Sequence, residues 1–203
     1  MIHYQISGGG TKVKVDVCVI GAGVAGLTAA RKAAEKGLKV LAAEKGSGAT
    51  IQSSGVIDVA GYLPPNHMFT SASEGVRTIA EKVKNHPYSI IGGGKKSEPE
   101  RRGRESERNV RRALDFFVEG MKSVGVNFRG SLDENVLVTN FLGTFKPTCL
   151  CPSTIYNGDL RRLDGSSLVL VGVKGFPDYD SKSVSYTHLR AHGLLSISYA
   201  VFC

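Results

Sequence analysis

The sequence predicts an α/β fold built on a parallel sheet, because strand and helix signals alternate at its start. An apolar run, Val15 to Ile20, is rich in β-branched residues, as in a strand buried on both faces. It enters a glycine-rich turn, Gly21 to Gly26, and then a run from Ala25 to Lys36 with small residues on one side and charges on the other. A second apolar run, Lys39 to Ala43, ends at the acid Glu44. This order is typical of a Rossmann-like, nucleotide-binding fold.

The composition is that of a globular protein. The 203 residues are 41% hydrophobic and 22% charged, enough for one buried domain or for one domain and part of another. No apolar run approaches the roughly 20 residues that a membrane-spanning helix needs, and no secretory signal precedes the first strand. We therefore expect a cytoplasmic chain.

Much of the formal charge of +8 lies between Lys95 and Arg112. Acids are interspersed there and no aromatic residue lies within the stretch, so it indicates a solvated loop and helix face. We expect no nucleic-acid partner. Of the cysteines, Cys18 is expected to be a small buried hydrophobic residue. Cys149 and Cys151 lack the further ligands that a metal site needs, so none is expected.

Each glycine of the turn has a physical role in binding a dinucleotide. Gly21 allows the tight strand-to-helix turn, and Gly23 lets a pyrophosphate approach the backbone without meeting a Cβ. Gly26 lets the helix pack closely on the strand. The first helical residues, Val24 and Ala25, offer free N–H groups and the positive end of the helix dipole to the phosphates.

The end of the second strand distinguishes between cofactors. Glu44, followed by Lys45, is placed to accept hydrogen bonds from ribose hydroxyls, which disfavours NADP. The loop from Gly46 to Gly55 is long, small and rich in hydroxyls, and it suits a large cofactor such as a flavin. The candidate contacts in this region are Glu44, Lys45, Ser53, Ser54 and Gly55.

Beyond these residues, several stretches resemble the B subunit of the anaerobic glycerol-3-phosphate dehydrogenase, a flavoprotein family whose archaeal-type members look most similar. They are Val15–Gly37, Ser53–Pro64, Asn85–Ser89, Leu142–Thr148 and Leu168–Ser181. The glycine turn is shared by many flavoproteins, whereas the other stretches, in this order, are much more specific. The resemblance implies the FAD/NAD(P)-binding flavoprotein fold called GR2-type, of which this chain holds the N-terminal part.

The resemblance also implies an activity and partners. The family oxidises sn-glycerol 3-phosphate to dihydroxyacetone phosphate and passes electrons towards quinone. Its partners are an FAD-containing catalytic subunit and an iron–sulfur subunit at the membrane, through which this chain would lie peripherally at the cytoplasmic face. The family is usually described with FMN on this subunit, but Glu44 and the intact glycine turn favour FAD, so we rank FAD first and FMN second. Lys146 matches a basic position of the family and is a candidate phosphate contact.

Two other functions stay open on the residues alone. The present residues contain no convincing acid–base pair beside the flavin site, so the catalytic residues are unknown. A non-catalytic flavin- or nucleotide-binding subunit that relays electrons or supports assembly of the complex is the alternative, and an NAD-linked reductase is the third possibility.

The rest of the chain predicts further elements. Capping-box spacing at Ser71 opens a helix over residues 72–84, and His86 before Pro87 is expected to cap a turn. Residues 92–104 read as a polar loop, and an apolar stripe from Val110 to Val124 reads as a core helix closed by Gly125. Short strands follow over 126–148, and another buried strand over 168–173.

The predicted regions are an N-terminal tail (1–14), a flavin-binding region (15–125), the start of an inserted α+β region (126–183) and a final segment (184–203). Read back through the genetic code, Val184–His192 and Ile197–Cys203 are compatible with the two constant parts of a transposase-type sequencing adapter. We therefore expect residues 184–203 to be translated adapter and the chain to be an inactive fragment whose catalytic residues lie downstream.

Overall fold

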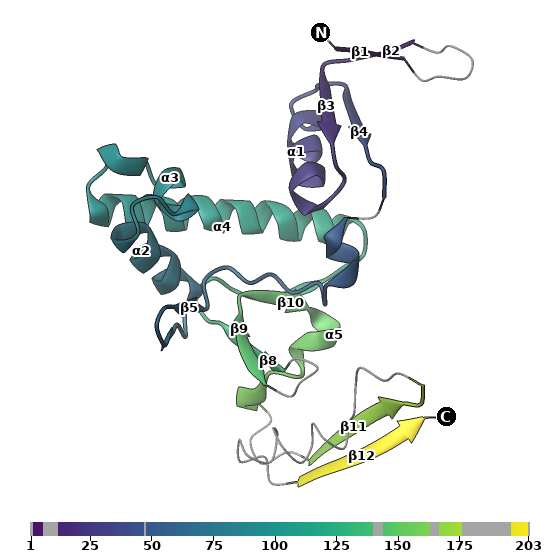
Figure 1. Cartoon of the computed structure of the whole chain (residues 1–203), viewed down its shortest axis with the longest axis vertical. Coiled ribbons are helices and arrows are strands. Elements are labelled where there is room, and N and C mark those ends of the chain that lie inside the picture. The colour runs from purple at the N-terminus through teal and green to yellow at the C-terminus, as the bar shows by residue number, and fades with distance from the viewer. Residues whose placement is uncertain are drawn as a thin grey trace. The chain divides into compact units, whose positions relative to one another are not determined.

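The computed structural model describes residues 2–5, 12–46, 48–139, 144–162, 167–175 and 196–202 (Figure 1). The chain forms two compact units, Met1–Gly55 and Val56–Cys203. The functional boundaries predicted after residues 125 and 183 stay predictions.

The first unit contains the predicted strand–helix–strand arrangement. Its elements are β1 (Ile2–Gln5), β2 (Lys12–Val15), β3 (Val17–Ile20), α1 (Val24–Ala34), β4 (Val40–Ala43) and the 3-10 turn η1 (Ala49–Gln52). β3 and β4 pair in parallel with Ile20 opposite Ala43, as a strand–helix–strand unit requires. α1 ends where Gly37 has a φ of 79°, the left-handed conformation that the sequence predicts for it. In the segment predicted as a tail, β1 and β2 pair in antiparallel fashion.

The burial predicted for the first strand is wrong. β3 is only half-buried, and the side chain of Ile20 is 89% exposed. In the part of the chain that the structure describes, β4 alone pairs with β3. A two-stranded sheet cannot bury a strand on both faces. The apolar side chains of β3 are therefore less buried than their sequence predicts.

The second unit combines a helical layer with small antiparallel sheets. Its elements are β5 (Tyr62–Leu63), β6 (His67–Met68), α2 (Ala72–Lys82), α3 (Pro87–Ile91), η2 (Gly94–Lys96), α4 (Pro99–Ser123), β7 (Phe128–Gly130), β8 (Val136–Thr139), β9 (Phe145–Thr148), β10 (Leu150–Pro152), α5 (Ser153–Tyr156), η3 (Leu160–Arg162), β11 (Ser167–Val173) and β12 (Ser196–Phe202). The pairs β5–β6, β7–β10 and β8–β9 are antiparallel.

β11 and β12 form a separate parallel pair. β11 confirms the strand predicted over 168–173, but its residues Val169 and Val171 are exposed, so the predicted burial is wrong. Among the described residues β12 alone pairs with β11. β12 lies within the segment that the sequence attributes to an adapter, and that attribution stays a prediction.

The starts of α2 and α3 follow the sequence signals. The Ser71 hydroxyl accepts a hydrogen bond from the Glu74 amide at 3.3 Å, as a capping residue should. His86 caps α3, because its Nδ1 accepts from the Tyr88 amide at 3.2 Å, and Pro87 occupies the first turn. Both cap predictions are confirmed.

α4 is longer than its sequence pattern indicates. It begins at Pro99, so the loop predicted over 92–104 ends several residues earlier. Proline is favourable in a first turn. The helix continues through Gly103, where a Cβ would press on the Glu81 side chain. The helix ends before Gly125, as predicted, but Val124 is 71% exposed and so is not core.

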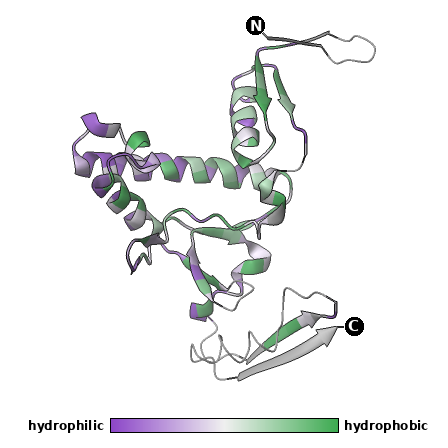
Figure 2. Cartoon of the chain, viewed as in Figure 1, coloured by the Kyte–Doolittle hydropathy of each residue, from purple (hydrophilic) through white to green (hydrophobic). Residues whose placement is uncertain are grey.

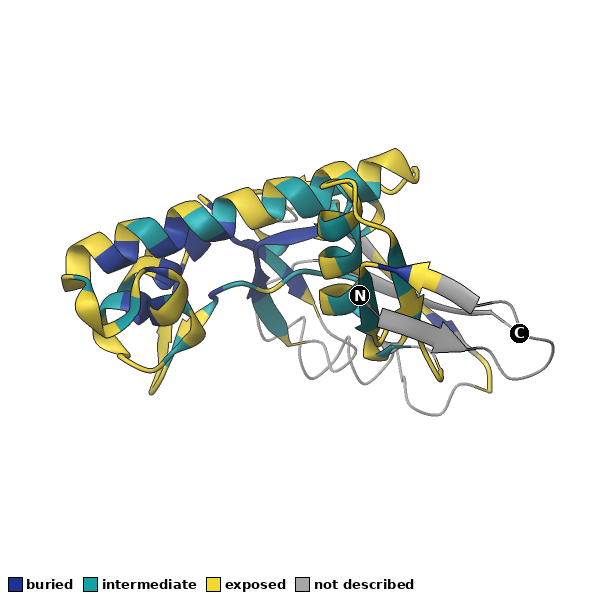
Figure 3. Cartoon of the chain, turned by 90° about the horizontal axis from the view of Figure 1, so that it is seen from above, coloured by how far each residue is buried: buried dark blue, intermediate teal, exposed yellow. Residues whose placement is uncertain are grey.

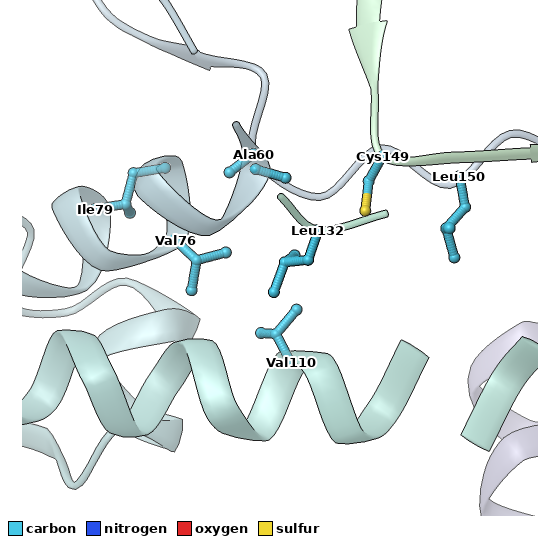
Figure 4. Close-up of a cluster of buried hydrophobic side chains, with 8 residues drawn as sticks. Ala60, Val76, Ile79, Val110, Leu132, Cys149 and Leu150 are labelled. Carbon is cyan, nitrogen blue, oxygen red and sulfur yellow. The ribbon is translucent and has the colours of Figure 1, made fainter. Parts of the chain in front are cut away.

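The core of the second unit lies between α2, α4 and the strand segments, as Figure 4 shows. It comprises Ala60, Ala72, Val76, Ile79, Val110, Leu132, Cys149 and Leu150. α2 lies close to the chain before it, because a Cβ at Gly75 would come within 2.7 Å of the Ala60 Cβ. The buried residues of α4 recur at helical spacing from Arg102 to Val110, in keeping with its amphipathic sequence, and Figure 3 shows them among exposed residues along the helix.

A buried arginine corrects the expectation that the basic stretch is wholly solvated. Arg102 is only 4% exposed, and it donates to the carbonyls of Ala80 at 2.7 Å, Glu81 at 2.9 Å and Ser97 at 3.0 Å. A charge can be buried when hydrogen bonds replace its water, and carbonyls at a helix C-terminus attract a cation. Arg102 therefore fixes the end of α2 to the segment before α4.

An ion network joins α2, α4 and the turn before β8. The nearly buried Glu107 accepts hydrogen bonds from Arg77 and, at 2.9 Å, from Arg111. Arg111 also donates to both oxygens of Asp133, at 2.6 and 3.0 Å. Burial acts to raise the pKa of Glu107, but hydrogen bonds from Arg77, Arg111 and Ser73 outweigh it, so the pKa lies below its ordinary value.

We predict that Glu107→Gln lowers the free energy of unfolding by about 2 kcal/mol at pH 7, because two cations lose a charged acceptor. A lowered pKa gives stabilisation that is present above the ordinary value of 4.5 and is lost as the pH falls through the lowered pKa. The difference between wild type and variant should therefore shrink below pH 4.5 in urea titrations. Glu100→Gln, at an exposed position on the same helix, is the control and should change little. A pH-independent difference would contradict the prediction.

Candidate functional site

The glycine turn is tied directly to the end of β4. Gly21 has a φ of 100°, in the left-handed region where glycine is favoured, and its amide donates to the Ala43 carbonyl at 2.8 Å. This bond continues the parallel ladder by one residue beyond β3. The turn and the start of the segment after β4 therefore lie at the same edge of the sheet.

Gly26 allows α1 to lie against the turn and the strand. A Cβ at this position would collide with the Gly21 carbonyl oxygen and would come within 3.3 Å of Cγ1 of Val19. A larger residue would therefore push the helix away from β3. The geometry agrees with the role in close helix–strand packing that the sequence predicts for Gly26.

Gly23 is not required by the protein's own packing. It is the N-cap of α1 with a φ of −72°, a conformation that any residue adopts, and a Cβ there would have no neighbour within 4 Å. α1 has no side-chain cap at this end and no acid in its first turn. The first-turn residues Val24 and Ala25 are exposed. An anion can therefore approach the unpaired amides of this turn.

Gly48 is a residue of this region that the sequence analysis did not single out. A Cβ at Gly48 would lie 3.0 Å from Cα of Gly23 and 3.4 Å from its nitrogen. The segment after β4 thus touches the glycine turn, backbone against backbone. The sequence signal was the run of small residues around Gly48. Such a run allows another segment of backbone to approach closely, but it does not identify that segment.

Glu44 follows Ala43 at the sheet edge that holds Gly21. It is exposed, as is Lys45, and the Glu44 carboxylate has no ion pair among the described residues. The other acids of the strand–helix–strand segment have structural partners. Asp16 accepts from the Lys39 amide at 2.9 Å, and Glu35 pairs with Arg31 at 3.1 Å. Glu44 is therefore the acid of this segment that remains available to a ligand.

Ser53, Ser54 and Gly55 form a turn at the end of the first unit. The Gly55 amide donates to the Ser53 hydroxyl at 3.2 Å, and Gly55 has a φ of 76°. Ser53 and Ser54 are exposed. All ten residues predicted to contact the cofactor belong to the first unit, so one compact body carries the whole candidate set.

Lys146 belongs to the second unit, on β9. Its amino group donates to one oxygen of Asp58 at 2.6 Å, and the Thr148 hydroxyl donates to the other oxygen. Both partners of the ion pair are partly exposed. Sequence reasoning missed Asp58, because an ion pair across 88 residues leaves no local signal.

Cys149 and Cys151 are buried thiols. Burial raises the pKa of Cys149 to about 12 and also raises that of Cys151. Both are therefore protonated at neutral pH and unreactive. Within the described ranges, no group of three or more histidines, cysteines or acids is placed to hold a metal ion.

Comparison with known protein families matches residues 16–196 to the FAD binding domain. The chain belongs to this FAD-binding family. The match covers most of the chain, confirms the Rossmann-like flavoprotein fold and confirms FAD, the first choice of the sequence analysis, as the cofactor.

Curated relatives of this FAD-binding chain are named as the B subunit of anaerobic glycerol-3-phosphate dehydrogenase. The protein of Mannheimia succiniciproducens is 29% identical over 81% of this chain and 35% of its own length. That of Vibrio cholerae is 31% identical over 81% and 34%, and that of Pectobacterium carotovorum 27% over 92% and 41%. These confirm the resemblance predicted from the sequence, while its archaeal character stays a prediction.

The FAD-binding chain spans about a third of the length of the curated relatives it matches. No solved structure matches it. Among the residues that the structure describes, no helix combines the length and the apolar character needed to cross a bilayer.

The geometry of the first unit fits FAD. An adenine dinucleotide presents a doubly charged pyrophosphate and a ribose with two hydroxyls. The uncapped first turn of α1 and the open space at Gly23 suit the pyrophosphate, and the unpaired Glu44 suits the hydroxyls.

Proposed function

We propose that the first unit holds the adenosine diphosphate part of FAD along the edge formed by the glycine turn and the end of β4. Gly21, Gly23, Val24, Ala25 and Gly26 would receive the pyrophosphate, and Glu44 the adenosine ribose. Lys45 and the turn Ser53–Gly55 would line the continuing path of the cofactor. The observation that supports this assignment concerns Gly23. Among the described residues, neither its backbone conformation nor the packing around it requires a glycine at this position.

We further propose that this chain is part of a flavoprotein subunit that oxidises sn-glycerol 3-phosphate to dihydroxyacetone phosphate and passes the electrons towards quinone. The names of the curated relatives support this proposal. Bound FAD supplies the redox chemistry, while the protein binds and orients it. An FAD-containing catalytic subunit and an iron–sulfur subunit at the membrane would be its partners, with the chain on the cytoplasmic face.

Within that proposal, Lys146 is the candidate contact for the substrate phosphate. Its present partner, Asp58, neutralises the charge that would attract a phosphate. Binding through Lys146 therefore requires the phosphate to displace a carboxylate that is exposed and hence exchangeable.

An electron-relay or assembly role is the second candidate, and one observation favours it. Residues 15–55 contain no histidine, and their acids other than Glu44 have structural partners. Apart from Glu44, which is assigned to the ribose, residues 15–55 thus offer no spare histidine or carboxylate for taking a proton from an alcohol. A relay protein needs none.

Anaerobic reduction distinguishes the two functions. We predict that sn-glycerol 3-phosphate bleaches the flavin absorbance of the full-length subunit purified without its partner subunits, whereas glycerol without phosphate does not. Dithionite should bleach it in either case and serves as the control. If dithionite reduces the flavin but the phosphate ester does not, relay is supported and oxidation by this protein is excluded.

We predict that Gly23→Val weakens FAD binding about ten- to a hundredfold, because a branched side chain would occupy the space in which the pyrophosphate meets the backbone. Flavin retained on the purified protein and equilibrium binding of FAD provide the measurement. Gly46→Val is the matched control, since Gly46 is equally free of packing contacts. Both variants should keep the wild-type circular dichroism spectrum. Unchanged FAD binding by Gly23→Val would refute the assignment.

We predict that Glu44→Ala weakens FAD about ten- to a hundredfold and leaves FMN binding unchanged. FMN has no adenosine ribose, so the carboxylate has nothing to bind in it. Glu35→Ala removes another exposed acid, one that pairs with Arg31, and should affect neither cofactor. Equal weakening of FAD and FMN in Glu44→Ala would show that Glu44 acts through the fold.

A further inference from the structure

A projecting corner of the second unit exposes apolar side chains. It comprises residues 82–97, which run from the last residue of α2 through α3 and η2 to the segment before α4. Ile90 is 64% exposed and Ile91 45% exposed, and Val83 is also exposed. Figure 2 shows the apolar α3 beside the strongly hydrophilic start of α4. An isoleucine pair in a short surface helix is not accounted for by the core of this unit.

The same corner carries four lysines, with Glu81 and Glu98 directly outside its two ends. Lys82, Lys84, Lys95 and Lys96 are all exposed, and residues 82–97 contain no aspartate or glutamate. None of the four lysines has a carboxylate partner within the described ranges. The two isoleucines therefore lie between two pairs of uncompensated positive charges in the sequence, Lys82 and Lys84 before them and Lys95 and Lys96 after them.

α3 is held firmly from its inner side. The buried Ser89 hydroxyl bonds to the Ala80 carbonyl at 2.8 Å, and the Tyr88 hydroxyl donates to the Val59 carbonyl at 2.6 Å. On α4, the Asn109 side chain donates to the Ile91 carbonyl at 2.9 Å. Arg102 fixes the following turn through the Ser97 carbonyl. These hydrogen bonds fix the backbone that carries the two isoleucines. The Tyr88 and Ser89 hydroxyls of α3 already have hydrogen-bond partners inside the unit.

We propose that this corner docks directly onto an anionic lipid surface, with Ile90 and Ile91 in the headgroup region and the lysines against lipid phosphates. Aliphatic side chains flanked by lysines are typical of peripheral membrane contacts, where each basic residue contributes to attraction by acidic lipids. Protein interfaces instead favour aromatic residues and arginine and are depleted in lysine. The corner offers neither a free aromatic hydroxyl nor an arginine. The proposal does not rest on the flavin chemistry or on a partner subunit.

The test is flotation of the full 203-residue chain with lipid vesicles on a density gradient, because aggregated protein sinks whereas bound protein rises. Vesicles of phosphatidylcholine alone are compared with vesicles that also contain phosphatidylserine. The wild type should float with the anionic vesicles and not with the neutral ones, and added salt should weaken the binding. Ile90→Ser with Ile91→Ser, and separately Lys95→Glu with Lys96→Glu, should each lower the partition coefficient roughly tenfold or more.

The controls are Val124→Ser and Lys122→Glu, which alter an exposed apolar residue and an exposed lysine at the other end of α4. Both should float like the wild type, and all variants should keep its circular dichroism spectrum. Binding that depends on the lysines but not on the isoleucines would overturn the proposal in favour of purely electrostatic adsorption, without insertion into the headgroup region. Equal flotation with neutral vesicles, or none with anionic ones, would also overturn it.

Discussion

The parallel pairing of β3 with β4, extended by the hydrogen bond from the Gly21 amide to the Ala43 carbonyl, is the constraint on which the candidate FAD site depends. It brings the glycine turn and Glu44 to one edge, although Gly21 and Ala43 lie 22 positions apart in the sequence. Gly26 then sets how closely α1 approaches that edge. Turn, helix terminus and acid are thus placed by backbone geometry, with little help from side-chain packing.

The second unit is stabilised in a different way. There, buried or half-buried arginines join elements whose apolar contacts are modest in size. Arg102 gathers carbonyls from the end of α2 and from the segment before α4, while Arg111 connects Glu107 to Asp133. Such charged bonds are directional, so they fix the relative placement of α2, α3 and α4 more sharply than a small apolar core can. The braced corner at α3 is a product of this arrangement.

The sequence predicted the local features of the fold well and the distant ones poorly. Val17–Ile20, Gly37, Ser71 and His86 carry signals within a few residues of where they act, and the structure agrees with each of them. The burial of Arg102 and the pairing of Lys146 with Asp58 depend on residues far along the chain, so no period or spacing reveals them. The exposure of Ile20 has a related cause. An apolar sequence shows that a strand can be buried, but it does not show whether other elements pack against that strand.

The contact between Gly48 and Gly23 has a consequence for how the segment after β4 is positioned at this edge. Where two glycines face each other, the separation of the two segments is set by main-chain atoms, which have no rotamers to adjust. The distance between the glycine turn and the segment after β4 therefore does not depend on how neighbouring side chains are arranged. A methyl group added at position 48 would act as a spacer of fixed size, shifting the whole segment after β4 outward and altering the fit for every ligand in the same sense.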